Sequence, residues 1–204
     1  MKTLDTIAAI ATPLSPSGIG VIRVSGFESI LVLDNFFKDI SLQKVDSHKL
    51  VYTWINYNGT LIDKVLVVVM RAPNSYTKED TVEIQCHGSP YVLRKILALI
   101  LENGIRLAER GEFTQRAFLN GRIDLTQAEA ITDLINAKSD LAAKTAANQM
   151  EGKLFHAINN VKKKITSLTS KVEARIEFPE EVSGYEFRQE CLKILQISIK
   201  NLEE

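Results

Sequence analysis

Cysteine, tryptophan and long apolar runs are scarce in this sequence of 204 residues, which has two cysteines and one tryptophan. Cys86 and Cys191 lie far apart, so the sequence shows neither a disulfide framework nor the ligand spacing of a zinc site. The longest apolar run, Val65–Met70, is too short to span a bilayer, and Met1–Asp5 carries an early acid in place of the apolar segment of a secretory signal. These absences predict a protein of the reducing cytoplasm with no membrane segment.

An excess of charge of one sign is also missing, because 25 Lys and Arg residues balance 25 Asp and Glu residues. Proteins that bind nucleic acid mainly through electrostatic attraction usually carry a basic excess. The balanced charge argues against such a protein and leaves open only a nucleic-acid contact through a local basic patch. The run Lys162–Lys164 is more typical of a solvated helix face than of an RNA contact.

Several sequence motifs of catalysis are absent as well. The sequence has no P-loop of the form G-x-x-x-x-G-K-[ST] and no G-x-G-x-x-G between a strand and a helix. The histidines His48, His87 and His156 have no metal-ligand spacing. We therefore expect no metal site and assign no catalytic residue.

Short apolar runs alternate with turn signals in the first part of the chain. Ile19–Ser25 and Thr81–His87 alternate in the manner of strands, and Asn58-Gly59 between two apolar runs is a strong hairpin signal. Ser89-Pro90 is typical of a helix start, with serine as the N-cap and proline at the first helical position. These signals predict an α+β domain, a mixed sheet with helices, over residues 1–119.

Residues 120–204 read as long helices. Thr126 and Glu129 fit a capping box, and from Ser139 the pattern predicts one helix up to Phe178, with Gly152 as its weak point. Apolar residues recur along it in steps of three and four, as in a narrow seam for a partner helix, at Val161, Ile165, Leu168 and Val172. The second part is therefore predicted to be an all-α domain of long antiparallel helices.

Two strands carry polar residues on the face opposite their apolar one. Alternation places Arg23 and Glu83 on such faces. A carboxylate at position 83 can accept two parallel N–H bonds from a flat, amidine-like ring edge, or it can form an ion pair with Arg23 or Arg71. His87 either lines a site with Glu83 or has a structural or surface role, whereas Cys86 is predicted to be a buried structural thiol.

The segment Gly111–Leu125 joins the two parts of the chain and combines charged, amide and large apolar side chains. Glu112 and Arg116 are four residues apart, which predicts a salt bridge on a helix. Arg122 follows a turn at Asn120-Gly121 and either contacts an anionic ligand at the domain boundary or takes part only in packing.

These segments together resemble the N-terminal part of the MnmE/TrmE family of tRNA-modification GTPases. The residues that carry the resemblance occur in order along nearly the whole chain: Asp5–Pro13, Gly18–Gly26, Pro73–Asp80, Cys86–Gly88, Gly111–Ala130 and Phe178–Glu181. One departure is Ser89, which stands where the family more often has a glycine.

The resemblance implies a fold similar to the folate-binding domains of one-carbon transferases. It implies a homodimer through residues 1–119 and a reduced folate, 5-formyl- or methylene-tetrahydrofolate, bound near the dimer interface. Carried over by motif, Arg23 is the folate-contacting arginine and Glu83 is the carboxylate that reads the pterin edge. Arg122 stands where the family has a basic residue, often lysine, near the ligand.

The implied function is cytoplasmic modification of the wobble uridine of tRNA, with the folate as one-carbon donor and an MnmG/GidA-type flavoprotein as partner. In the family a GTP-binding domain is inserted into the helical domain, close to where these 204 residues stop. GTP, Mg²⁺ and K⁺ belong to that domain, so we do not expect this chain by itself to hydrolyse GTP.

Two other functions stay open at the level of the sequence. One is a free-standing, folate-dependent enzyme similar to aminomethyltransferases, in which Glu83, His87 or Asp124 would serve as acid or base. The other is a scaffold for the flavoprotein and tRNA that binds no small ligand.

Overall fold

The computed structural model describes residues 5–177 and 184–203. The chain divides between Ile123 and Asp124 into two compact units. We call residues up to Ile123 the sheet unit and residues from Asp124 the helical unit, and each is described by itself. The motif Phe178–Glu181 lies outside the described residues.

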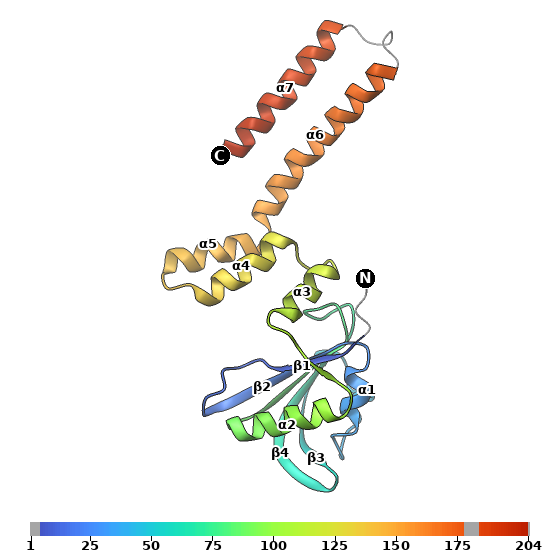
Figure 1. The fold of residues 1–204 in the computed structure, drawn as a ribbon, viewed down its shortest axis with the longest axis vertical. Coiled ribbons are helices and arrows are strands. Elements are labelled where there is room, and N and C mark those ends of the chain that lie inside the picture. The colour runs from blue at the N-terminus through green and yellow to red at the C-terminus, as the bar shows by residue number, and fades with distance from the viewer. Residues whose placement is uncertain (1–4, 178–183, 204) are drawn as a thin grey trace. The chain divides into compact units, whose positions relative to one another are not determined.

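The sheet unit contains a six-stranded sheet of order β3-β4-β5-β2-β1-β6 (Figure 1). Its strands are β1 (Ile7–Ile10), β2 (Ser17–Ser25), β3 (Leu50–Tyr57), β4 (Thr60–Met70), β5 (Thr81–Gly88) and β6 (Arg106–Leu107). All neighbours are antiparallel except β1 and β6, which pair in parallel. The prediction of a mixed sheet with helices, followed by helices alone, is therefore confirmed.

The β3–β4 hairpin forms at the predicted turn. Asn58 and Gly59 have φ angles of 50° and 80°. Because a tight hairpin turn that matches the right-handed twist of its strands needs positive φ at both central residues, Asn-Gly selects this turn and with it the pairing of β3 with β4.

One face of the sheet is covered by helices α1 (Ser29–Asp34) and α2 (Pro90–Glu102), which are joined to the strands by loops and the short 3₁₀ turn η1 (Leu42–Lys44). The apolar stripe of α2 packs on the inward residues of the central strands, as the alternation predicts. Residues fully removed from solvent at this contact include Ile22, Val24, Ile84, Leu93, Ile96 and Ile100.

The opposite face is here called the open face, and it carries Arg23 and Glu83. Helix α3 (Glu112–Leu119) and the loop 71–80 contact the end of this face near Arg23. Toward β3 the open face exposes large side chains, with Tyr52 61% and Trp54 38% exposed. The sheet thus has one side filled by the core and one side that is only partly covered.

The helical unit contains α4 (Leu125–Asn136), α5 (Asp140–Met150), α6 (Lys153–Glu177) and α7 (Gly184–Glu203). Helices α4 and α5 contact each other, as do α6 and α7, which run antiparallel in Figure 1. An ion pair of 2.5 Å joins Lys171 of α6 to Glu190 of α7. Val161 and Leu168 of the predicted seam are buried, whereas Ile165 and Val172 stay 43% and 38% exposed.

Two predictions for the helical unit are wrong. The capping box is made by Asp124 and Gln127, not by Thr126 and Glu129, because the Asp124 side chain accepts the Gln127 N–H while the Gln127 side chain accepts the Asp124 N–H. The helix predicted from Ser139 is two helices, because Gly152 adopts a φ of 76° and ends the run.

No helix within the described ranges is both long and apolar enough to cross a membrane.

The contact between Gly88 and Ser17 yields a prediction for stability. A Cβ added at Gly88 would lie 2.5 Å from the backbone oxygen of Ser17, whereas a Cβ at Gly18 would meet nothing within 4 Å. We expect Gly88→Ala to lower the free energy of unfolding by about 2 kcal/mol, since a strand must shift to relieve the overlap. Gly18→Ala, the control, should change it by less than about 0.5 kcal/mol. Urea titration measures both, and equal effects would contradict the close approach.

Candidate ligand site

Arg23 of β2 and Glu83 of β5 face each other across the open face, because the two residues pair directly in the antiparallel register. The Arg23 Nε–H donates to Glu83 Oε1 at 2.7 Å. The side chains are 30% and 19% exposed, so the pair is screened from bulk water but reachable from the open face. The ion pair with Arg23 that the sequence left open for Glu83 is thus formed. Arg71 instead donates to the backbone oxygens of the segment that contains η1.

Two aromatic rings flank the Arg23 guanidinium. Its central carbon lies 5.6 Å from the ring centroid of Tyr76 in the loop 71–80 and 5.5 Å from that of Phe113 in α3. Guanidinium groups at this distance are attracted to the negative ring face. Arg23 is therefore held by a carboxylate and two rings that come from three different segments.

Arg122 reaches the same group of side chains from the end of the sheet unit. Its guanidinium carbon lies 6.0 Å from the Tyr76 ring centroid, and its Nη1 donates to the Ser75 backbone oxygen at 2.9 Å. The structure thus pairs Arg23 with Glu83 and links Arg122 to them through Tyr76. Arg122 packs on the loop and its side chain is exposed, so this geometry agrees both with a contact to an anionic ligand and with a packing role alone.

Tyr76 and Phe113 were not singled out from the sequence. Both stand inside segments that carry the family resemblance, Pro73–Asp80 and Gly111–Ala130. Their shared position around Arg23 depends on tertiary contacts between segments far apart in the chain, so no spacing rule could have found it.

The arrangement can bind a flat, polar heterocycle. A carboxylate has more acceptor positions than Arg23 uses, because each of its oxygens carries two lone pairs. Within residues 5–177 and 184–203, Glu83 Oε2 accepts no hydrogen bond. The site therefore offers an acceptor edge next to a fixed cation and two aromatic rings.

Cys86 and His87 point to opposite sides of β5. Cys86 is 4% exposed, and burial, assisted by the charge of Asp63, raises the pKa of its thiol to about 11. It is therefore the predicted buried, unreactive thiol. The exposed His87 ring lies 2.7 Å from the carboxylate of Asp63, which also accepts the His87 backbone N–H. His87 thus has a surface partner of its own and no contact with Glu83.

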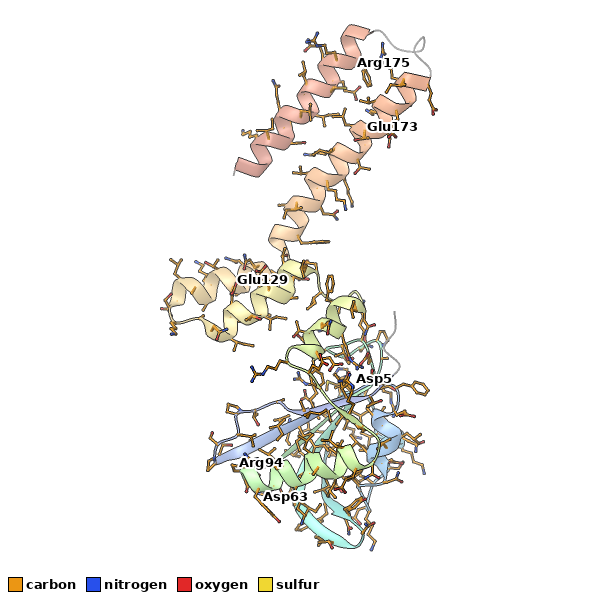
Figure 2. All side chains as sticks on the ribbon, viewed as in Figure 1. Asp5, Asp63, Arg94, Glu129, Glu173 and Arg175 are labelled. Atoms are coloured by element: carbon orange, nitrogen blue, oxygen red, sulfur yellow. The ribbon has the colours of Figure 1, made fainter. Side chains whose placement is uncertain are left out.

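A second set of charged side chains connects α3 to the rest of the sheet unit. We call it the Arg116 cluster: Asp5, Glu79, Arg106, Glu112 and Arg116. Arg116 is only 1% exposed. Its guanidinium donates to Glu112 at 3.0 Å, to the Asp5 carboxylate at 2.8 Å and to Glu79 at 3.3 Å. The predicted salt bridge between Glu112 and Arg116 is therefore confirmed as one part of a larger cluster. Asp5 is labelled in Figure 2.

Glu112 is the most strongly perturbed acid of this cluster. A hydrogen bond from Arg106, joined by those from the Glu109 backbone and Arg116, outweighs burial and lowers its pKa to about 2. The pKa of Asp5 is also lowered, chiefly by its hydrogen bond from Arg106. Both acids are therefore anionic at neutral pH.

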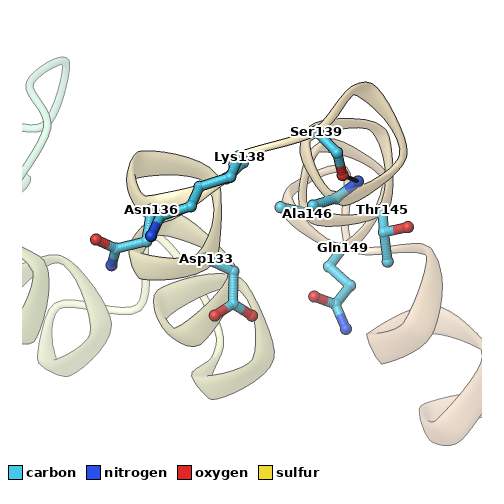
Figure 3. A pocket seen from close by; sticks show the side chains of 9 residues that line it. Asp133, Asn136, Lys138, Ser139, Thr145, Ala146 and Gln149 are labelled. Atoms are coloured by element: carbon cyan, nitrogen blue, oxygen red, sulfur yellow. Dashed lines mark hydrogen bonds between the residues drawn. The ribbon is translucent and has the colours of Figure 1, made fainter.

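The helical unit has an open depression of about 560 Å³ between α4 and α5, lined by polar side chains such as Asp133, Lys138 and Gln149 (Figure 3). Most of these side chains are exposed and none is a buried, unpaired polar group. Among the described residues, no group of three or more His, Cys, Asp or Glu side chains could hold a metal ion. The open face thus remains the place where charged and aromatic groups converge.

Comparison with known proteins agrees with this assignment of units. A family model described as the GTP-binding protein TrmE N-terminus matches residues 6–122, and one described as the MnmE helical domain matches residues 125–204. The chain belongs to the MnmE/TrmE family of tRNA-modification GTPases. The two matches meet where the sheet unit ends and the helical unit begins.

Curated MnmE proteins are similar along most of this chain. The tRNA modification GTPase MnmE of Lachnoclostridium phytofermentans is 46% identical over 208 residues, covering 100% of this chain and 45% of that protein. Those of Streptococcus thermophilus and Clostridioides difficile are 50% and 49% identical, covering 88% and 87% of this chain and 39% of each relative. The chain thus spans less than half the length of these MnmE relatives.

The lowered pKa of Glu112 predicts a pH dependence of stability. Because its pKa is depressed in the folded state, Glu112 contributes stability that is present above its ordinary value of 4.5 and is lost as the pH falls toward about 2. We expect Glu112→Gln to lower the free energy of unfolding by about 3 kcal/mol at pH 7, with the difference shrinking below pH 4.5.

Denaturant titrations at a series of pH values measure this difference. Glu102→Gln, at an exposed carboxylate of α2, serves as the control and should show no such trend. A Glu112→Gln difference that stays constant between pH 7 and pH 3 would contradict the role of its charge.

Proposed function

We propose that this chain is the part of a tRNA-modification GTPase that binds a reduced folate and forms a homodimer. The observation that carries the proposal is the Arg23–Glu83 pair, held at 2.7 Å between the Tyr76 and Phe113 rings on the open face. Membership of the MnmE/TrmE family supports the same function, because the resemblance assigns folate contacts to Arg23 and Glu83.

The residues present fit a reduced pterin. A pterin has a flat amidine-like edge whose adjacent N–H groups match a carboxylate in a two-bond arrangement. Glu83 would receive that edge with Oε2 and the second lone pair of Oε1, while the bond from Arg23 to Oε1 fixes the carboxylate in place. Tyr76 and Phe113 would supply apolar ring surface, and Arg122 would supply a positive charge beside Tyr76. A bound 5-formyl- or methylene-tetrahydrofolate supplies a one-carbon unit, which is the chemistry that this site would present.

The uncovered part of the open face supports the proposed homodimer. Tyr52, Trp54 and Ile19 are exposed there, and Lys64 Nζ lies 4.4 Å from the Tyr52 ring centroid. Exposed aromatic and aliphatic side chains gathered on one face are typical of a protein–protein interface. Since these residues share the face with Glu83, a second copy seated on them would lie close to the folate site.

In the whole protein, we propose that the folate unit acts with a GTP-binding domain and an MnmG/GidA-type flavoprotein in the cytoplasm. The substrate would be the wobble uridine of tRNA, modified with the folate's one-carbon unit. GTP, Mg²⁺ and K⁺ would bind only to the GTP-binding domain, so the residues described above would take no part in GTP hydrolysis.

Replacement of Glu83 tests the folate site. We expect isothermal titration calorimetry to detect binding of 5-formyl-tetrahydrofolate to the folded protein. Glu83→Gln should weaken it by about 10- to 100-fold, because a charge-assisted bond and its geometry are lost. Asp46→Asn is the control, since that carboxylate makes only a 3.9 Å pair with Lys49.

Absence of binding to the folded wild-type protein, or unchanged affinity of Glu83→Gln, would overturn the site. Turnover of the one-carbon donor by this chain would instead favour a free-standing enzyme. Capture of the flavoprotein and tRNA without any folate effect would favour a scaffold.

The dimer is tested on the edge strand β3. We expect sedimentation velocity to show a dimer whose dissociation constant rises at least about tenfold in Trp54→Ala, because buried tryptophans dominate many interfaces. Tyr91→Ala is the matched control, since Tyr91 is 72% exposed on α2 at the other face of the sheet. A monomeric wild-type protein, or equal effects of the two substitutions, would contradict an interface on the open face.

A further inference from the structure

The loop 71–80 carries Tyr76 but lies on the open face without regular structure of its own. It is fastened to α3 and the turn after it by side chains. The Tyr76 hydroxyl and Thr114 Oγ1 are 2.9 Å apart, Asn120 donates to the Thr77 oxygen at 2.7 Å, and Lys78 donates to the Gly121 oxygen at 2.8 Å. The position of the Tyr76 ring thus depends on where α3 lies.

A further connection, between side chains that are 1% and 15% exposed, runs from Arg116 to Glu79. Arg116 Nη1 lies 3.3 Å from Glu79 Oε2, and that same oxygen accepts the Ser25 hydroxyl at 2.8 Å. Ser25 ends β2, the strand that carries Arg23. Glu79 therefore joins the loop that holds Tyr76, the strand that holds Arg23 and the helix that holds Phe113.

We propose that Arg116 is a positioning residue for the ligand site, which acts through Glu79 to hold the Tyr76 and Phe113 rings against the Arg23 guanidinium. Arg116 lies on the same helix as Phe113 and does not itself contact Arg23 or Glu83. The inference rests on the proposed folate site for its effect on ligand binding, but its effect on Arg23 can be measured without any ligand.

The chemistry of the group explains why an arginine stands there. Only a guanidinium presents several donors in one plane, so it can bind Asp5, Glu79 and Glu112 at once, whereas a lysine ammonium is a compact point charge. Lysine at this position would keep the charge balance but lose the fixed directions of these bonds. Arg116→Lys therefore changes geometry more than charge.

The test combines affinity with a spectroscopic signature of Arg23. We expect Arg116→Lys to weaken binding of 5-formyl-tetrahydrofolate on the order of tenfold. We also expect the NMR resonance of the Arg23 Nε–H to move, because ring currents of Tyr76 and Phe113 act on it. Arg94→Lys is the control, since Arg94 is exposed on α2, away from the open face. It should leave both readouts close to those of the wild type.

A double-mutant cycle separates positioning from general destabilisation. If Arg116 acts through the loop, then Arg116→Lys should cost less than about twofold in affinity once Tyr76 is replaced by alanine. Additive losses, or an unchanged Arg23 resonance in Arg116→Lys, would overturn the proposal. Should Arg116→Lys fail to fold, Glu79→Gln, at a partly accessible side chain, replaces it with the same expectations.

The two proposals fail in different ways. A wild-type protein that binds no folate would refute the folate site, yet the Arg23 resonance would still decide whether Arg116 positions the rings. Folate binding that depends on Glu83 but not on Arg116 would keep the site and refute the positioning role.

Discussion

A buried guanidinium needs other groups to replace its hydration, and the two terminal nitrogens of Arg116 obtain these groups from Asp5 before β1, Glu79 in the loop 71–80 and Glu112 in α3. Removal of one partner from such a buried cluster typically costs about 3–5 kcal/mol, because the remaining charge stays buried. The end of the open face is therefore held by a polar cluster, whereas the helix-covered face is held by apolar packing. This division lets the ligand face carry charged and aromatic groups without a core of its own.

The sheet and its covered face could be predicted because local patterns determine them. Alternation in β2 and β5 gave the correct faces for Ile22, Val24, Arg23 and Glu83, and Asn58-Gly59 marked the hairpin. The parallel strand β6 was missed, because two residues at a sheet edge carry no periodic signal. The capping box was placed at the wrong residues because Thr-x-x-Glu and Asp-x-x-Gln both fit the rule, and only the bonds made by Asp124 distinguish them.

The candidate site could be predicted only in part, for a related reason. Arg23 and Glu83 follow from strand register, which is a local property once the two strands are recognised as partners. The positions of Tyr76 and Phe113 beside Arg23, and of Arg116 among three acids, depend on contacts between residues far apart in the sequence. Neither spacing nor composition predicts such contacts. From the sequence, Arg116 is predicted only to form a helical ion pair with Glu112, because the other two acids that it binds, Asp5 and Glu79, lie in distant segments.

The bonds between Arg116 and Asp5 join residues separated by 111 positions. During synthesis on the ribosome, Asp5 therefore meets Arg116 only after α3 has been made. Contacts of such long range must close a large loop first, which slows folding and leaves strand edges unpaired in the meantime. The nascent sheet unit is thus expected to need protection from aggregation until the segment around Arg116 has left the ribosome. The ionic contact between Arg116 and Asp5 then forms and completes the unit.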